Sequence, residues 1–138
     1  MAKRLKICVC ILSTLSFGFS FPGNTGENNE WKVPLEADKL VNPLIENKTA
    51  TEEGKKIYAQ ICTVCHGEKG KGDGAAGIAL SPKPGNFTSE KVQQQTDGAL
   101  FWKLTEGRPP MASYKNILTE TQRWQLVNYL RTFKTIKK

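Results

Sequence analysis

The residue types best suited to chemistry in this sequence lie together, in Cys62-Thr63-Val64-Cys65-His66. Two thiols three positions apart fall on one side of a helical turn, where they can bond the two vinyl groups of a haem. A histidine that directly follows the second thiol is placed to ligate the haem iron. The pattern therefore predicts covalent attachment of one haem c through Cys62 and Cys65, with His66 as an iron ligand.

The surroundings of these cysteines disfavour two other kinds of site. A structural zinc site needs four protein ligands. The chain has a single histidine and only two further cysteines, Cys8 and Cys10, in a segment that we expect to be removed. A thioredoxin-like redox pair needs a βαβ context, whereas the pattern of apolar residues around Cys62 is helical.

A second iron ligand is predicted at Met111. A haem that only moves electrons benefits from two strong axial ligands, because they exclude substrate and limit rearrangement between oxidation states. Met111 is the only methionine besides Met1, and it follows Pro109 and Pro110, which stiffen the loop. Methionine often serves as core filler, but its uniqueness and its setting favour ligation here. A thioether paired with histidine raises the reduction potential, which favours an electron carrier over an oxygen-activating site.

A glycine-rich stretch, residues 67 to 77, follows the cysteine–histidine motif. Gly72, Gly74 and Gly77 match the dinucleotide-binding pattern G-x-G-x-x-G, but that function needs a strand before the glycines. Because the haem motif precedes them instead, we expect a loop that turns sharply past the haem edge. Further on, a backbone carbonyl of Pro82 or of its neighbours is predicted to accept a hydrogen bond from Nδ1 of His66.

Helices are predicted to position these residues. One begins at a Thr49 or Thr51 cap and leads straight into Cys62. A short helical segment is expected after Ser89, and another helix over residues 97 to 104, stopped by Gly107.

The last helix has the clearest local signal. Thr119 and Gln122 form a capping box ahead of an apolar stripe. Gly54, inside the first helix, costs about 1 kcal/mol relative to alanine. Close approach of the last helix, with Tyr129 against Gly54, would account for that glycine.

Residues 1–20 read as a signal peptide. Lys3, Arg4 and Lys6 precede an apolar run from residue 7 to 15, and small residues stand before a cut after Ser20. A permanent membrane anchor is disfavoured because the run is shorter than the roughly 20 residues that a bilayer needs. A lipidated Cys8 or Cys10 is disfavoured because both lie too early in the run. We expect an exported, periplasmic protein, with membrane association only through partners or an uncleaved segment.

Removal of the signal peptide takes three basic residues and no acidic ones, so the formal net charge falls from +7 to +4. Two haem propionates would lower it further, to about +2. The basic balance is therefore weak support for a nucleic-acid partner, and none is expected.

Two regions follow the signal peptide in this interpretation. Residues 21–48 form an extended segment, and residues 49–138 the main domain. Apolar residues in the first region are too many for a freely solvated tail, so part of it is expected to lie against the domain; they are Trp31, Val33, Leu35, Leu40 and Leu44.

From about Thr49 to Phe133 the sequence resembles a class I cytochrome c, of the monohaem bacterial periplasmic type. The resemblance rests on C-x-x-C-H at 62 to 66, on Met111 and on Leu126-Val127-Asn128-Tyr129-Leu130 near the end of the last helix. It implies an all-α cytochrome c fold, with three to five helices and loops wrapped around one covalently attached haem. Many members have proline after the ligand methionine, where this chain has Ala112.

The function predicted is electron transfer between periplasmic or membrane-bound redox proteins, without enzymatic activity or a small-molecule substrate. Lysines near the haem edge, together with a basic domain, would suit an acidic docking surface on a partner; they are Lys69, Lys71, Lys83, Lys103 and Lys115. Two alternatives remain open: an electron-entry subunit of a larger oxidoreductase, and a haem sensor or peroxidase-like protein with a labile Met111.

Overall fold

A computed structural model describes residues 30–135, and within them the protein is helical, without strands. Residues from Trp31 onward form one compact unit, separate from Met1–Glu30. The predicted signal peptide, residues 1–20, lies outside the described part of the chain. The elements in chain order are α1 (Leu35–Asp38), α2 (Lys48–Ile61), α3 (Thr63–His66), the 3₁₀ helix η1 (Gly77–Ala79), α4 (Glu90–Gln93), α5 (Asp97–Glu106) and α6 (Glu120–Arg131).

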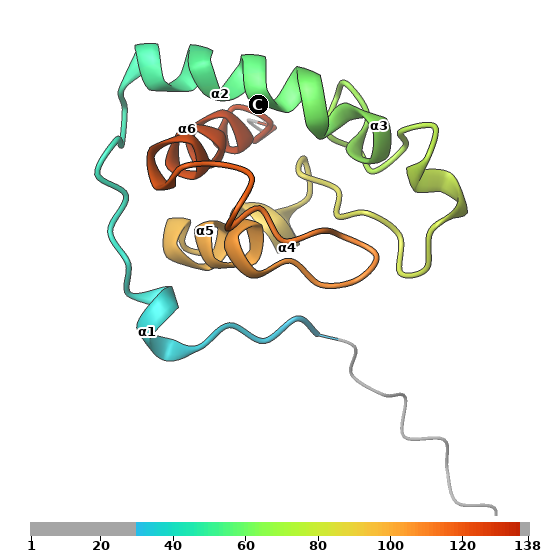
Figure 1. Ribbon diagram of the computed structural model, residues 1–138, viewed down its shortest axis with the longest axis horizontal. Helices are drawn as coiled ribbons and strands as arrows, with labels where there is room; N and C mark the ends of the chain where they lie inside the picture. The colour runs from blue at the N-terminus through green and yellow to red at the C-terminus, as the bar shows by residue number, and fades with distance from the viewer. Residues whose placement is uncertain (1–29, 136–138) are drawn as a thin grey trace, which may run out of the picture. The chain divides into compact units, whose positions relative to one another are not determined.

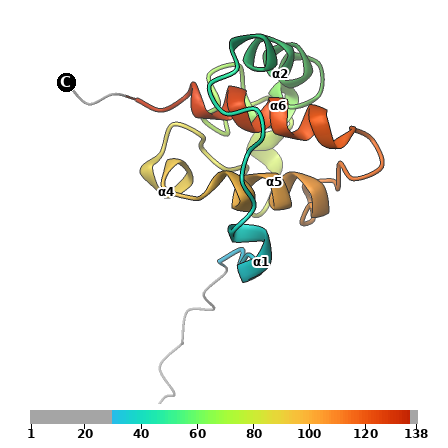
Figure 2. The ribbon, with the colours of Figure 1, turned by 90° about the vertical axis from the view of Figure 1, so that its left-hand side faces the viewer.

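The three longest helices stack in the order α2, α6, α5, so that α6 is covered on two sides (Figures 1 and 2). The all-α fold expected from the sequence is confirmed. None of the helices in residues 30–135 is both long and apolar enough to cross a membrane.

The ends of the helices follow from local sequence, with one difference from expectation. Thr119 and Gln122 form the predicted capping box of α6, and Gly107, with φ +65°, ends α5. The cap of α2 is Asn47, whose side chain accepts a hydrogen bond from the Ala50 N–H at 3.0 Å. Thr49 and Thr51, the predicted caps, lie inside the helix, because the Asn47 side chain two to four residues earlier already caps one of the free N–H groups at its start.

α2 and α6 cross at Gly54, as predicted, but Tyr129 is not the contact. A Cβ at Gly54 would stand 2.5 Å from the carbonyl carbon of Gln125 and closer still to its oxygen. The glycine therefore accommodates backbone rather than an aromatic ring. Tyr129 packs one turn further along, beside Tyr58, with ring centroids 5.2 Å apart.

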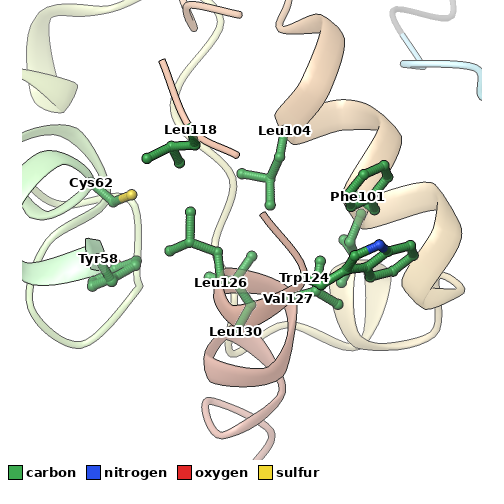
Figure 3. Close-up of a cluster of buried hydrophobic side chains, with 10 residues drawn as sticks. Tyr58, Cys62, Phe101, Leu104, Leu118, Trp124, Leu126, Val127 and Leu130 are labelled. Carbon is green, nitrogen blue, oxygen red and sulfur yellow. The ribbon is translucent and has the colours of Figure 1, made fainter. Parts of the chain in front are cut away.

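The buried core is formed mainly by α2, α5 and α6 (Figure 3). Leu126 and Val127 of α6 are almost completely buried, and Leu100 and Leu104 of α5 face them. Cys62 belongs to the same cluster, and its sulfur is directed inward (Figure 3). Together these buried side chains form the core cluster, which consists of Tyr58, Cys62, Leu100, Phe101, Leu104, Leu118, Trp124, Leu126, Val127 and Leu130.

Part of the segment before α2 lies against the helices, as expected, but only some of its apolar residues take part: Trp31, Val33 and Leu44 are half-buried, and Leu44 packs against the core cluster. Ala37 of α1 is buried where Gly98 of α5 leaves room for its carbonyl. Asn42 is 4 % exposed, whereas Leu35 and Leu40 are 71 % and 45 % exposed. Polar hydrogen bonds and a close backbone contact therefore hold this segment together with the half-buried apolar residues Trp31 and Leu44.

Candidate functional site

Cys62 and Cys65 lie at the junction of α2 and α3. The N–H of Cys62 still bonds the Tyr58 carbonyl at 2.9 Å, and the Cys62 carbonyl accepts from the N–H groups of Cys65 and His66 at 3.2 and 2.9 Å. The motif therefore forms a single tight turn of helix. Neither residue forms a disulfide; Cys62 is buried and Cys65 half-buried. Burial, with a smaller effect of Cys65, raises the pKa of Cys62 to about 12, so the thiol is neutral.

His66 is oriented by a backbone carbonyl, but not by the predicted one. Its Nδ1 lies 3.1 Å from the oxygen of Gly85, just beyond the proline-containing stretch around Pro82. Since a carbonyl only accepts, Nδ1 carries the proton. Burial lowers the pKa of His66, partly opposed by this hydrogen bond. The ring is thus neutral, and the lone pair of Nε2 is left for a metal.

Phe87 supports the same ring. The Phe87 and His66 rings are stacked, with centroids 4.4 Å apart and an angle of 20° between their planes. Phe87 also packs against the core cluster, two residues after the carbonyl that holds His66. A hydrogen bond and a stacked ring together fix the imidazole, which limits the entropy that metal ligation would otherwise cost.

The glycine-rich stretch is a loop that folds back onto α3. Its N–H groups satisfy the carbonyls at the end of that helix: Gly72 donates to His66 at 2.9 Å and Gly74 to Cys65 at 3.2 Å. Gly72 has φ +78°, a conformation that favours glycine. No strand precedes the loop in residues 30–135. The stretch therefore serves the cysteine–histidine motif and lacks the context of a dinucleotide site.

Met111 stands at the end of a tight turn. The N–H of Arg108 donates to the Met111 carbonyl at 3.0 Å, and the N–H of Met111 donates to the Arg108 carbonyl at 2.8 Å. The Met111 side chain is half-buried and packs against the core cluster, to which Cys62 belongs. The structure thus brings Met111, from between α5 and α6, to the same core as the cysteine-bearing turn.

Tyr114 links the two regions more closely. It packs against the core cluster like Met111. Burial raises the pKa of its phenol, and the nearby Cys62 and Cys65 raise it further. Because the core cluster contains Cys62, this packing brings the segment after Met111 to the core that the cysteine-bearing turn also joins.

Arg123 of α6, a residue that the sequence did not single out, anchors the end of this loop. Its Nη1 donates to the carbonyls of Lys115 and Leu118, at 3.1 and 2.8 Å. Arg123 is only 8 % exposed, and its guanidinium lies over the Phe101 ring, 5.1 Å from the centroid. The sequence did offer a signal for this role: a basic residue stands directly before Trp124, in the apolar part of the last helix.

The donor set fits a haem. Two thiols are available to bond the vinyl groups, and a neutral imidazole with Nε2 available and a thioether are the groups that could ligate the iron. Across residues 30–135 no three His, Cys, Asp or Glu side chains are grouped as ligands of a protein-bound metal ion. A porphyrin supplies four nitrogens itself and needs only axial ligands. Half-buried apolar side chains beside the core, among them Ile61, Phe87, Met111 and Tyr114, provide the surface that such a group would cover.

Comparison with known proteins agrees with this chemistry. The family profile Cytochrome c matches residues 51–134. The chain is similar in structure to a component of the reducing HAO-like protein complex Kustc0457/Kustc0458 of Kuenenia stuttgartiensis, with a TM-score of 0.60 and 28 % identity over 67 % of this chain and 47 % of the other. It is also similar to the KustC0563 c-type cytochrome, with a TM-score of 0.51 and 29 % identity over 59 % of this chain and 98 % of the other. No curated protein matches the sequence.

The chain belongs to the cytochrome c family. Its cofactor is accordingly a covalently bound haem c, and its chemistry is haem-based electron transfer. The chain spans about half of the Kuenenia component to which it is similar.

Proposed function

We propose that the protein carries one electron at a time on a single haem c, which Cys62 and Cys65 tether and whose iron His66 and Met111 ligate. The observation that carries this proposal is the packing of Met111 on the core cluster that contains Cys62. When bound, the haem supplies the redox centre, and the protein supplies its two axial ligands. A His/Met pair suits an electron carrier because neither ligand has to leave when the oxidation state changes.

The protein residues in this proposal bind and orient. The Gly85 carbonyl holds the His66 ring through Nδ1, and the Arg108–Met111 backbone pair holds the turn that carries the thioether. Apolar side chains around both exclude water from the iron. No side chain is assigned as an acid, a base or a nucleophile, so the protein is proposed to be a carrier and not an enzyme.

The partners are proposed to be other redox proteins on the periplasmic side of the membrane, reached after removal of residues 1–20. Four of the five lysines expected near the haem are exposed: Lys69, Lys71, Lys83 and Lys115. Lys103 is half-buried instead, and its Nζ donates to Gln95 at 2.6 Å. The exposed four would steer an acidic partner, with an association rate that falls as salt is added.

Two measurements on the purified holoprotein test the proposal. Its intact mass must equal that of the chain plus one haem, and a potentiometric titration must follow a single one-electron transition. A Cys62→Ser, Cys65→Ser variant, expressed in parallel, serves as the control that retains no covalent haem. A mass without added haem, or with two, would overturn the proposal.

A second candidate function is that of an electron-entry subunit in a larger oxidoreductase. The similarity to a component of a Kuenenia complex favours it. Purification at native abundance separates the two: a diffusing carrier elutes alone, whereas a subunit elutes with its complex. The remaining alternative, a sensor or peroxidase-like protein, requires Met111 to leave the iron readily, and binding of carbon monoxide to the reduced protein detects that.

A further inference from the structure

Trp31, in the segment before α1, contacts two cations beside the Met111 turn. The Arg108 guanidinium carbon lies 4.9 Å from the centroid of the Trp31 ring. The Lys103 Nζ lies over the same ring at 5.5 Å. Trp102 packs edge-on against it, with centroids 6.4 Å apart and an interplanar angle of 64°. Trp31 is thus held by Trp102 and Lys103 of α5 and by Arg108, the first residue of the turn.

Arg108 is the residue that closes the turn. Its N–H and carbonyl form both backbone hydrogen bonds to Met111, at 3.0 and 2.8 Å. A contact that restrains the Arg108 side chain therefore restrains the backbone opposite Met111. After Met111 the chain is anchored separately, since the N–H of Tyr114 donates to the Leu104 carbonyl at 3.0 Å and Ser113 Oγ to the Thr105 carbonyl at 2.6 Å. Trp31 acts on the other side of the turn.

The position of Trp31 is itself fixed by the segment that carries it. Thr96 Oγ1 donates to Asp38 at 2.7 Å, and the Nδ2 of Asn42 donates to Asp97 and Asn128, both at 2.7 Å. These bonds attach the segment to the start of α5, at Thr96 and Asp97, and to Asn128 of α6. These anchors follow Trp31 in the chain and restrict the segment that carries it, which lowers the entropic cost of the contact between Trp31 and Arg108.

We propose that Trp31 is a positioning residue for the axial ligand: by holding Arg108, it keeps the Met111 turn closed and the thioether on the iron. This inference rests on the proposed function, because it takes Met111 as the ligand. A cation–π contact at a partly exposed site changes an equilibrium by about two- to fivefold. Since only Arg108 of the two cations belongs to the turn, loss of the Trp31 ring should ease detachment of Met111 by this same factor.

Competition with imidazole tests the proposal in the oxidised holoprotein. Imidazole replaces Met111 on the iron, which removes the weak long-wavelength sulfur-to-iron absorption band. In Trp31→Leu the imidazole concentration for half-replacement should fall by about two- to fivefold. Leu35→Ala, a change at a 71 % exposed position of the same segment, should leave it unchanged.

A double-mutant cycle separates positioning from general support of the fold. Trp31→Leu and Arg108→Gln should each lower the half-replacement concentration, and the double variant should lower it less than the product of the two. If Trp31→Leu lowers the denaturation midpoint but leaves the imidazole titration unchanged, the residue is merely structural and the inference is wrong. If the wild-type protein has no sulfur-to-iron band, Met111 ligation itself is wrong, and the inference fails with it.

Discussion

Gly54 of α2 lies directly against the backbone of Gln125 of α6, so closely that no side chain fits between the two helices. This contact sets the distance between α2, which leads into the cysteine–histidine turn, and α6, which contributes four of the ten residues of the core cluster. Gly54, which has no side chain, thereby helps to position Cys62 at the end of α2.

Gly54→Ala should destabilise the holoprotein by about 1–3 kcal/mol or more, because an added Cβ meets rigid backbone and forces the helices apart. Guanidinium denaturation followed by circular dichroism measures the change. Gly85→Ala is the matched control, since a Cβ there meets nothing within 4 Å and the carbonyl that holds His66 is kept. Equal effects of the two substitutions would contradict the packing described.

Tyr58→Phe tests the buried phenol that closes the cysteine–histidine turn. Tyr58 Oη donates to the Gly67 carbonyl at 2.7 Å, and Tyr58 is 1 % exposed. Leaving that carbonyl without a partner should cost about 1–3 kcal/mol of unfolding free energy at neutral pH.

The same pair predicts a pH dependence. Burial is the main cause that raises the pKa of Tyr58 above its usual value near 10. The folded state therefore favours the protonated phenol, and its stabilising contribution is complete below about pH 10 and is lost as the pH rises further. The difference in unfolding free energy between wild type and Tyr58→Phe should shrink above that pH. A difference that stays constant from pH 8 to 11 would show that the phenol is not buried.

Asn42→Ala tests how the segment before α2 is held. The Asn42 amide donates to Asp97 and Asn128, and its oxygen accepts from the Leu44 N–H at 2.9 Å. Because these partners are at least partly buried, we expect a loss of about 1–3 kcal/mol in thermal or chemical unfolding. Val41→Ala, at a neighbouring position that is 84 % exposed, should change stability by less than about 0.5 kcal/mol. A null result for Asn42→Ala would mean that the segment is not docked through this residue.

Arg123→Met should loosen the loop that follows Met111. The substitution keeps most of the side-chain volume but removes the donors to Lys115 and Leu118, and hydrogen bonds from a charged group contribute about 1.5–3 kcal/mol each. We expect a loss of about 3–6 kcal/mol and faster amide hydrogen exchange around Leu118. Lys56→Met, which removes only an exposed ion pair with Glu53, is the control and should be nearly neutral.

The sequence predicted best what depends on neighbouring residues. The capping box at Thr119 and the glycine stop at Gly107 involve only a few consecutive positions, and both are confirmed. The class of cofactor likewise follows from the five-residue motif at Cys62. These features need no knowledge of how distant segments meet.

Contacts between distant segments could not be predicted residue by residue. The sequence indicated that α2 and α6 cross, but whether Gly54 meets Tyr129 or Gln125 depends on a shift of about one helical turn along the axis of α6. Gly85 rather than Pro82 holds His66 because the path of the intervening loop sets the acceptor. Asn42 was overlooked because a polar residue becomes buried only when distant partners, here Asp97 and Asn128, satisfy it.

The absorption spectrum of the oxidised holoprotein tests the central claim most directly, because it reports which atom occupies the second axial position of the iron. The account predicts a weak long-wavelength sulfur-to-iron band that is present in the wild-type protein at neutral pH and absent in Met111→Ala. A wild-type spectrum without that band, or one in which Met111→Ala retains it, would contradict ligation by Met111.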